Sequence, residues 1–262
     1  MKFSPFSTSP DPEMLYITPS IKSTIDKVMH LIDYRQGLTT IVADVGHGKS
    51  TVIRHLWNEL SKNKEVSLAS VLTPNFPSDF AMIKTICGEY GIAPRRSMLA
   101  QESALKDFLG QLDSEGRTAV ILIDEAQRLT GKQLELIRVL LNFETPKYKL
   151  VQIVLAGQLE LKYKLLDESK KALRSRIFAP SNLSPLSPAE MRRVIEFRCL
   201  KAGSLNPFSN EALQAIYNIT SGIPRDVLKI CQVLWVAAQK DGVEEIPVEW
   251  VEPMVKETEL DA

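Results

Sequence analysis

The chain has 262 residues, of which 44% are hydrophobic and 24% charged, and its 32 basic residues equal its 32 acidic residues. This is the composition of an ordinary globular protein, and the length allows one or two domains with a sizeable core. Zero net charge excludes a general attraction to nucleic acid or anionic lipid, so any such binding requires a local patch. Three widely spaced cysteines and three histidines exclude a disulfide framework and a zinc site.

The N-terminal segment, residues 1–20, contains four prolines and is predicted to form an extended arm that packs through its apolar residues. It lacks the apolar core of a signal peptide, and no apolar run in the chain is long enough to cross a bilayer. We therefore expect a cytoplasmic protein with no membrane partner.

A glycine-bearing loop follows the first predicted helix and strand. The helix runs from Ile21 to near Gly37, and the strand covers residues 38–42. The loop, residues 43–50, reads Ala-Asp-Val-Gly-His-Gly-Lys-Ser and opens a helix at 50–60. A strand, a glycine-bearing loop and Gly-Lys-Ser at a helix start form the arrangement that binds phosphate through backbone N–H groups.

Two residues at the end of this loop have a specific expected role in nucleotide binding. Lys49 is predicted to neutralise the β- and γ-phosphates, and the Ser50 hydroxyl to ligate Mg²⁺. The pattern departs from its usual form at Ala43, where glycine is expected, but alanine loses only the freedom of positive φ. The alternative is a tight turn with an incidental Gly-Lys-Ser. The other predicted nucleotide-binding residues are Val45, Gly46, His47, Gly48 and Thr51.

Beyond the loop, strands alternate with helices and are then replaced by helices alone. Predicted strands are 66–72, 119–125, 150–156 and one that starts near Ile177; predicted helices are 79–90, 98–112, 134–141, 159–173, 191–200, 209–219, 225–239 and 248–255. This order predicts a parallel α/β domain followed by a helical one. The expected boundaries are an arm at 1–20, an α/β nucleotide-binding domain at 21–184 and a helical lid at 185–262.

Two acids, Asp124 and Glu125, end the buried strand at 119–125. An acid at the end of a strand near a phosphate loop holds Mg²⁺, so Asp124 is a predicted metal ligand. A second carboxylate can polarise an attacking water, so Glu125 is the predicted base. Alone, two acids after an apolar run are a common strand ending; their position after a phosphate loop favours binding of ATP or GTP.

Three further positions complete the predicted site. Gln158 follows the strand at 150–156 and could orient the attacking water, or cap a loop. Arg174 and Arg176 precede the last strand; an arginine supplied to a neighbouring subunit stabilises a transferring phosphoryl group, although a solvated helix end is the usual role of such residues. Arg225 opens a lid helix and could reach the nucleotide.

The order of these motifs resembles that of AAA+ ATPases, and more narrowly that of their ExeA/GspA-like branch. The resemblance covers nearly the whole chain and implies a central parallel five-stranded sheet, a small all-helical lid, and Mg²⁺-dependent hydrolysis of ATP. It assigns Walker A to residues 43–50, Walker B to Asp124 and Glu125, sensor 1 to Gln158 and sensor 2 to Arg225. The matching stretches are Pro5-Phe6, Pro10-Asp11-Pro12, Leu15-Tyr16, Val154-Leu155-Ala156-Gly157-Gln158, Glu160-Leu161, Leu173-Arg174-Ser175-Arg176-Ile177, Leu186-Ser187, Arg198, Ala202-Gly203 and Gly222-Ile223-Pro224-Arg225.

The triplet Ser175-Arg176-Ile177 is similar to the finger motif of clamp loaders. The arginine that acts on a neighbouring subunit is therefore expected to be Arg176, with Arg174 as the second choice. Because the sequence stops at Ala262 without a membrane span, we expect a stand-alone member that resembles transposition regulators of the TnsC, TniB and MuB kind. This implies an ATP-dependent ring or helical oligomer on double-stranded DNA that recruits a transposase and target-selector proteins.

In such regulators, the faces that correspond to Asn75 and to Arg95 and Arg96 line the DNA channel, although a solvated loop explains the arginine pair equally well. The alternative function is that of an ExeA/GspA-type secretion or envelope-assembly ATPase that acts on protein partners.

Overall fold

The structure is a computed structural model in which residues 4–256 are described. The chain divides into two compact units. The α/β unit comprises Pro19–Asp44 and Val52–Leu183, and the helical unit comprises Val45–Thr51 with the described parts of Met1–Thr18 and Ser184–Ala262. No helix in the described part of the chain is both long enough and apolar enough to span a membrane.

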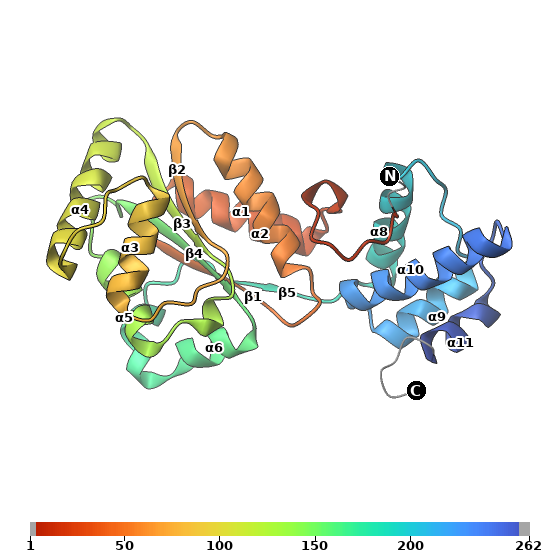
Figure 1. Cartoon of the computed structure of the whole chain (residues 1–262). Coiled ribbons are helices and arrows are strands. Elements are labelled where there is room, and N and C mark those ends of the chain that lie inside the picture. The colour runs from red at the N-terminus through yellow and green to blue at the C-terminus, as the bar shows by residue number, and fades with distance from the viewer. Residues whose placement is uncertain (1–3, 257–262) are drawn as a thin grey trace. The chain divides into compact units, whose positions relative to one another are not determined.

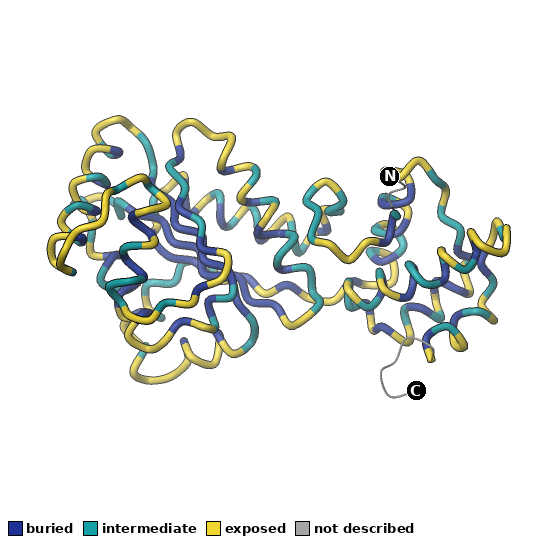
Figure 2. The backbone as a smooth tube through the Cα atoms, viewed as in Figure 1, coloured by how far each residue is buried: buried dark blue, intermediate teal, exposed yellow. Residues whose placement is uncertain are grey.

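A parallel five-stranded sheet with the order β2-β3-β4-β1-β5 forms the centre of the α/β unit (Figure 1). This confirms the predicted fold class. The strands are β1 (Leu38–Ala43), β2 (Val66–Val71), β3 (Thr118–Ile123), β4 (Val151–Gly157) and β5 (Ser181–Leu183). Figure 2 shows the central strands buried along their length. In β3, Ala119, Ile121 and Ile123 pack with the helices of one face, while Val120 and Leu122 are equally buried and alternate to the other face.

Helices cover both faces of this sheet. They are α1 (Pro19–Asp33), α2 (Lys49–Lys62), α3 (Asp79–Glu89), α4 (Met98–Ser114), α5 (Gly131–Leu140), α6 (Leu159–Leu166) and α7 (Lys171–Arg174), with short 3₁₀ turns at Ala126–Arg128 and Glu168–Lys170. Side chains fix several of their starts: Ser78 caps α3, Ser97 caps α4, and Thr130 forms a capping box with Gln133 on α5.

Two predicted elements differ from the structure. The strand expected near Ile177 is only an isolated bridge to Leu38, and β5 begins at Ser181. The ladder is interrupted because Ala179 has a φ of 43° and Pro180 has no N–H to donate. The single helix expected at 159–173 breaks at Asp167, whose carboxylate accepts the Ser169 N–H at 2.8 Å and so starts a separate turn.

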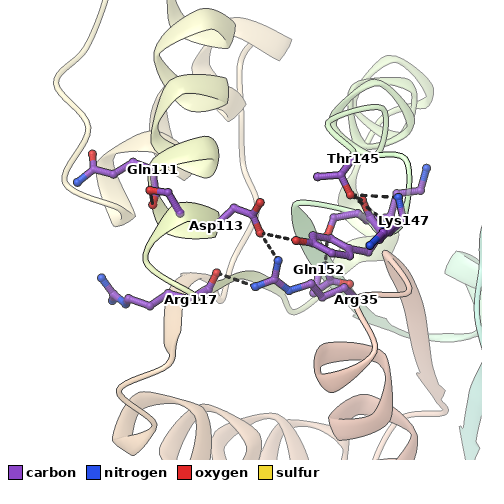
Figure 3. A network of polar contacts seen from close by, with 10 residues as sticks. Arg35, Gln111, Asp113, Arg117, Thr145, Lys147 and Gln152 are labelled. Carbon is purple, nitrogen blue, oxygen red and sulfur yellow. Dashed lines mark hydrogen bonds and ion pairs between the residues drawn. The ribbon is translucent and has the colours of Figure 1, made fainter.

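A polar network joins the amino ends of the strands, at the edge opposite the predicted site (Figure 3). Arg35 forms an ion pair with Asp113, donates to the Arg117 carbonyl at 3.1 Å, and lies 4.6 Å from the ring centre of Tyr148. The Tyr148 hydroxyl donates to Asp113 at 3.1 Å. These contacts tie the end of α4 to the start of β1, roughly 20 Å, or six extended residues, from the carboxyl ends of the strands.

The helical unit contains α8 (Pro188–Lys201), α9 (Asn210–Thr220), α10 (Pro224–Asp241), a turn at Val248–Trp250, and α11 (Val251–Lys256). The N-terminal arm belongs to its core. Phe6 is fully buried, with its ring centre 5.6 Å from that of Phe208. The buried Arg198 of α8 donates to the carbonyls of Pro5 at 3.1 Å, Ser7 at 2.9 Å and Met14 at 3.2 Å. Arg198 therefore binds the arm to the helices through backbone atoms.

Candidate nucleotide-binding site

The glycine-bearing loop leaves β1 and opens α2, as the sequence predicts. Gly46 and Gly48 have φ values of 83° and 84°, which side chains rarely adopt. Ala43, the departure from the usual pattern, is the last residue of β1, pairs with Leu183 and has no positive φ. Alanine at position 43 is therefore compatible with the backbone conformation. Lys49 is buried at 7% exposure, and His47 is half-buried.

The start of α10 contacts this loop within the helical unit. The Arg225 N–H donates to the Gly46 carbonyl at 3.1 Å. A Cβ on Gly46 would lie 2.9 Å from Ile223 Cγ2 and 3.2 Å from Arg225 Cβ, so glycine is needed here for space as well as for its backbone conformation. Pro224 fixes the first turn of the helix. The Arg225 backbone thus contacts the loop, while its side chain is exposed. That this side chain reaches a nucleotide stays a prediction.

Asp124 and Glu125 follow β3 at the carboxyl edge of the sheet. The Asp124 N–H donates to the Val71 carbonyl at 2.9 Å, and its carboxylate accepts the Glu125 N–H at 2.8 Å. Asp124 is only 7% exposed. Glu125 has a left-handed backbone with φ 51° and ψ 33°, a conformation that a non-glycine residue adopts only when its surroundings compensate.

The Glu125 carboxylate lies next to the predicted Gln158. Its Oε2 accepts from Gln158 Nε2 at 3.4 Å and from Gln127 Nε2 at 2.7 Å. Gln127 was not predicted from the sequence. The sequence shows only an amide two residues after Glu125, in Asp-Glu-Ala-Gln. That this amide also contacts Gln158 becomes evident only when β3 pairs with β4.

The order of the strands explains why these residues meet. Since β4 lies between β1 and β3 and all three are parallel, their carboxyl ends share one edge. Asp44 follows β1, Asp124 follows β3 and Gln158 follows β4. The phosphate loop continues directly from Asp44.

The two arginines predicted to act on a neighbouring subunit bind acceptors of their own chain. Arg176 donates to the Arg138 carbonyl at 2.9 Å and to Asn142 Oδ1 at 2.8 Å. Arg174 donates to the carbonyls of Leu165 and Leu166, at 3.2 and 2.6 Å. Both arginines therefore cap helix ends, the alternative role that the sequence left open.

The predicted DNA-contacting residues are exposed and lie in two loops. Asn75 precedes α3, whereas Arg95 and Arg96 follow it, and 11 helical residues separate the two loops by about 16 Å of helix axis. The Arg95 N–H donates to Gln101 Oε1 at 2.7 Å, which fixes the backbone and leaves the guanidinium exposed.

Metal-ligand chemistry at this edge is limited to a few oxygen atoms. Among residues 4–256, no group of three or more His, Cys, Asp or Glu side chains could hold a metal ion. A Mg²⁺ ion bound mainly by nucleotide phosphates and water needs only one or two protein oxygens. Ser50 and Asp124 stay the predicted ligands.

The chain is similar in sequence to a known domain family and to two curated proteins. The model of the AAA domain family matches residues 32–165. General secretion pathway protein A of Aeromonas hydrophila is 32% identical over 92% of this chain and 44% of its own length. An ORC1-type DNA replication protein of Desulfurococcus amylolyticus is 23% identical over 88% of this chain and 61% of its own length.

Among solved structures, the ORC2 protein of Aeropyrum pernix, determined as ADPNP and ADP complexes, superposes with a TM-score of 0.68. It is 17% identical, and the alignment covers 98% of this chain and 72% of that protein. The fold is therefore shared with that protein. The chain spans less than two thirds of either curated relative, about half in the first case.

Proposed function

Because the chain belongs to the AAA domain family, we propose that it binds ATP with Mg²⁺ and hydrolyses the terminal phosphate. The observation that carries this proposal is the convergence of three strand ends at one edge of the sheet. The phosphate loop follows β1, the acid pair follows β3, and Gln158 follows β4, which lies between them. This is the edge at which parallel α/β sheets bind their ligands.

The residues divide between binding and chemistry. Backbone N–H groups of Val45–Thr51 would surround the phosphates, and Lys49 would neutralise their charge. Ser50 and Asp124 would hold Mg²⁺, which neutralises charge on the phosphate oxygens when it is bound. Glu125 would take the proton of the attacking water, and the Gln158 amide would orient that water or the γ-phosphate.

Self-association would complete the site. We propose that Arg176, or else Arg174, reaches the nucleotide of a neighbouring copy after exchanging its present carbonyl acceptors for phosphate oxygens. A phosphate carries a full opposite charge and can accept two parallel N–H bonds from the guanidinium, which a single carbonyl cannot, so the exchange favours phosphate. Arg225, exposed at the start of α10, would report the nucleotide state to the helical unit.

Double-stranded DNA is the partner that we propose for the assembled protein. The exposed Asn75, Arg95 and Arg96 would contact phosphates, and a few contacts from each subunit suffice when many subunits line up. The similarity to an ORC1-type DNA replication protein supports this partner. The finer proposal is a transposition regulator that selects target DNA and recruits a transposase; it rests on the motif resemblance, and neither curated relative described above is a transposition protein.

A second candidate is an ExeA/GspA-type ATPase that acts on protein partners of a secretion or envelope-assembly system. The 32% identity to general secretion pathway protein A over 92% of the chain favours it. DNA would not be needed for its assembly.

Electron microscopy and gel shifts with duplex DNA separate the two candidates. The wild type should shift duplex at low salt with Mg²⁺ and a non-hydrolysable ATP analogue, and should form rings or filaments that require DNA. Lys49→Ala should lose nucleotide binding and with it the shift. If the analogue gives no shift at low salt, the DNA proposal is wrong. Rings or filaments that form with nucleotide equally well in the presence and absence of duplex DNA would favour the second candidate.

A further inference from the structure

We propose that Gln127 is a positioning residue that fixes the Glu125 carboxylate for ATP hydrolysis and links it to the end of β4. The proposal rests on the proposed function, since it concerns the base of that reaction. Gln127 lies in the turn Ala126–Arg128, two residues after Glu125, and all of its relevant contacts lie within the α/β unit.

The Gln127 amide is bound at both ends. Its Oε1 accepts the backbone N–H of Gln158 at 3.1 Å, and its Nε2 donates to Glu125 Oε2 at 2.7 Å. A backbone N–H can only donate, so it fixes the amide oxygen on its side and the amide nitrogen on the side of the carboxylate. The orientation of the amide therefore follows from its partners.

The surroundings of Gln127 are shaped for this amide. Gly157, the last residue of β4, would place a Cβ only 2.9 Å from Gln127 Oε1, so a larger residue there would displace the amide. The main chain of the same turn is held by Lys164, whose Nζ donates to the carbonyls of Gln127 at 2.5 Å and Leu129 at 3.0 Å. Both the backbone and the side chain of Gln127 are thus fixed.

Gln127 binds the carboxylate more closely than the predicted Gln158 does. The two amides donate to the same oxygen of Glu125, at 2.7 Å from Gln127 and 3.4 Å from Gln158. The longer distance is at the limit of a hydrogen bond, whereas the shorter one is in the optimal range. Of the two amides, Gln127 therefore restrains Glu125 more strongly, and the Gln158 backbone N–H in turn holds the Gln127 amide.

The hydrogen bonds from Glu125 through Gln127 to Gln158 should affect the rate of hydrolysis. A general base must lie within hydrogen-bond reach of the proton it takes, and small displacements lower the rate strongly. Glu125 has a left-handed backbone at the start of a turn, and its half-buried carboxylate accepts the Gln127 amide at 2.7 Å. Gln127 restrains this carboxylate and links it to the end of β4, so a movement of the β4 end would move the base as well.

Steady-state ATPase kinetics of Gln127→Leu test the proposal. We expect kcat to fall about 10- to 100-fold, because a misplacement of about 1 Å can cost roughly 100-fold in rate, with KM and the affinity for a fluorescent ATP analogue within about twofold of wild type. Gln111→Leu is the matched control: Gln111 donates to Glu115 Oε1 at 2.9 Å on the surface of α4, a glutamine–glutamate pair of the same kind, and its loss should leave both constants unchanged.

Adding Gln127→Leu to the Glu125→Gln variant separates a positioning role from a loss of structure. If Gln127 acts through the Glu125 carboxylate, the double variant should have the same kcat as Glu125→Gln alone. An unchanged kcat in the single variant, or an equal loss in both backgrounds, overturns the proposal. Should Gln127→Leu unfold, Gln127→Glu keeps the shape of the side chain but faces Glu125 with a second carboxylate, and wild-type turnover in that variant also overturns it. A wild type without ATPase activity overturns the proposed function itself.

Discussion

Gly222, at the start of the Gly-Ile-Pro-Arg motif, offers a sharp test of how the helical unit is packed. It has a φ of 74°, and a Cβ built on it would lie 2.1 Å from the Leu186 carbonyl oxygen. The Leu186 N–H in turn donates to the Gly222 carbonyl at 2.8 Å. Gly222→Ala must therefore move two backbone segments that are hydrogen-bonded to each other.

The control is Gly203→Ala in the same unit. Gly203 has the same φ of 74°, but a Cβ there would meet nothing within 4 Å. Its substitution isolates the cost of a left-handed alanine, about 1–2 kcal/mol. Gly222→Ala adds the cost of overpacking, about 1–3 kcal/mol. We expect losses in the free energy of unfolding of about 1–2 kcal/mol for the control and about 2–5 kcal/mol for Gly222→Ala.

Urea unfolding followed by tryptophan fluorescence measures both losses, because Trp235 and Trp250 pack against the core of the helical unit. Equal losses in the two variants would show that the backbone conformation alone requires glycine, and would refute the close approach of residues 186 and 222.

Four further outcomes are expected. The Glu125→Gln variant should bind ATP, hydrolyse it slowly and sediment mainly as the assembled oligomer. Normal turnover in this variant would exclude Glu125 as the base. Alanine at both Arg95 and Arg96 should weaken duplex binding and lower its salt dependence, and unchanged affinity in a gel shift removes them from the DNA surface. Arg198→Leu should lower the free energy of unfolding by about 3 kcal/mol in urea titration, since three carbonyls of the arm lose a charged donor, and a loss below about 0.5 kcal/mol would contradict this. Burial raises the pKa of Cys199 to about 11, so stability is full below the unfolded pKa near 8.5 and falls as pH rises toward 11; Cys199→Ala should flatten that slope in unfolding curves at pH 8 to 10.5.

Much of the fold was predictable because its signals are local. The apolar runs before Asp44, Asp124 and Gln158 have the length and continuity of strands buried on both faces, and the intervening segments have helical spacing. Strands that alternate with helices must form a parallel sheet, which the structure confirms. The predicted start of the last strand, near Ile177, was wrong because the positive φ of Ala179 interrupts the extended backbone before Ser181. The spacing of apolar residues in a sequence does not reveal such a backbone angle.

The residues proposed for nucleotide binding were likewise identified from the sequence, since loop, acid pair and amide each follow a strand, and parallel strands end at one edge. Contacts between side chains distant in sequence were decided only by the tertiary structure. Arg174 and Arg176 bind carbonyls of their own chain, a fact that depends on how α5 and α6 pack. Gln127 is the clearest case: two residues from Glu125 it is an ordinary amide, and it becomes a partner of the carboxylate only because β4 brings the Gln158 N–H within 3.1 Å of its oxygen.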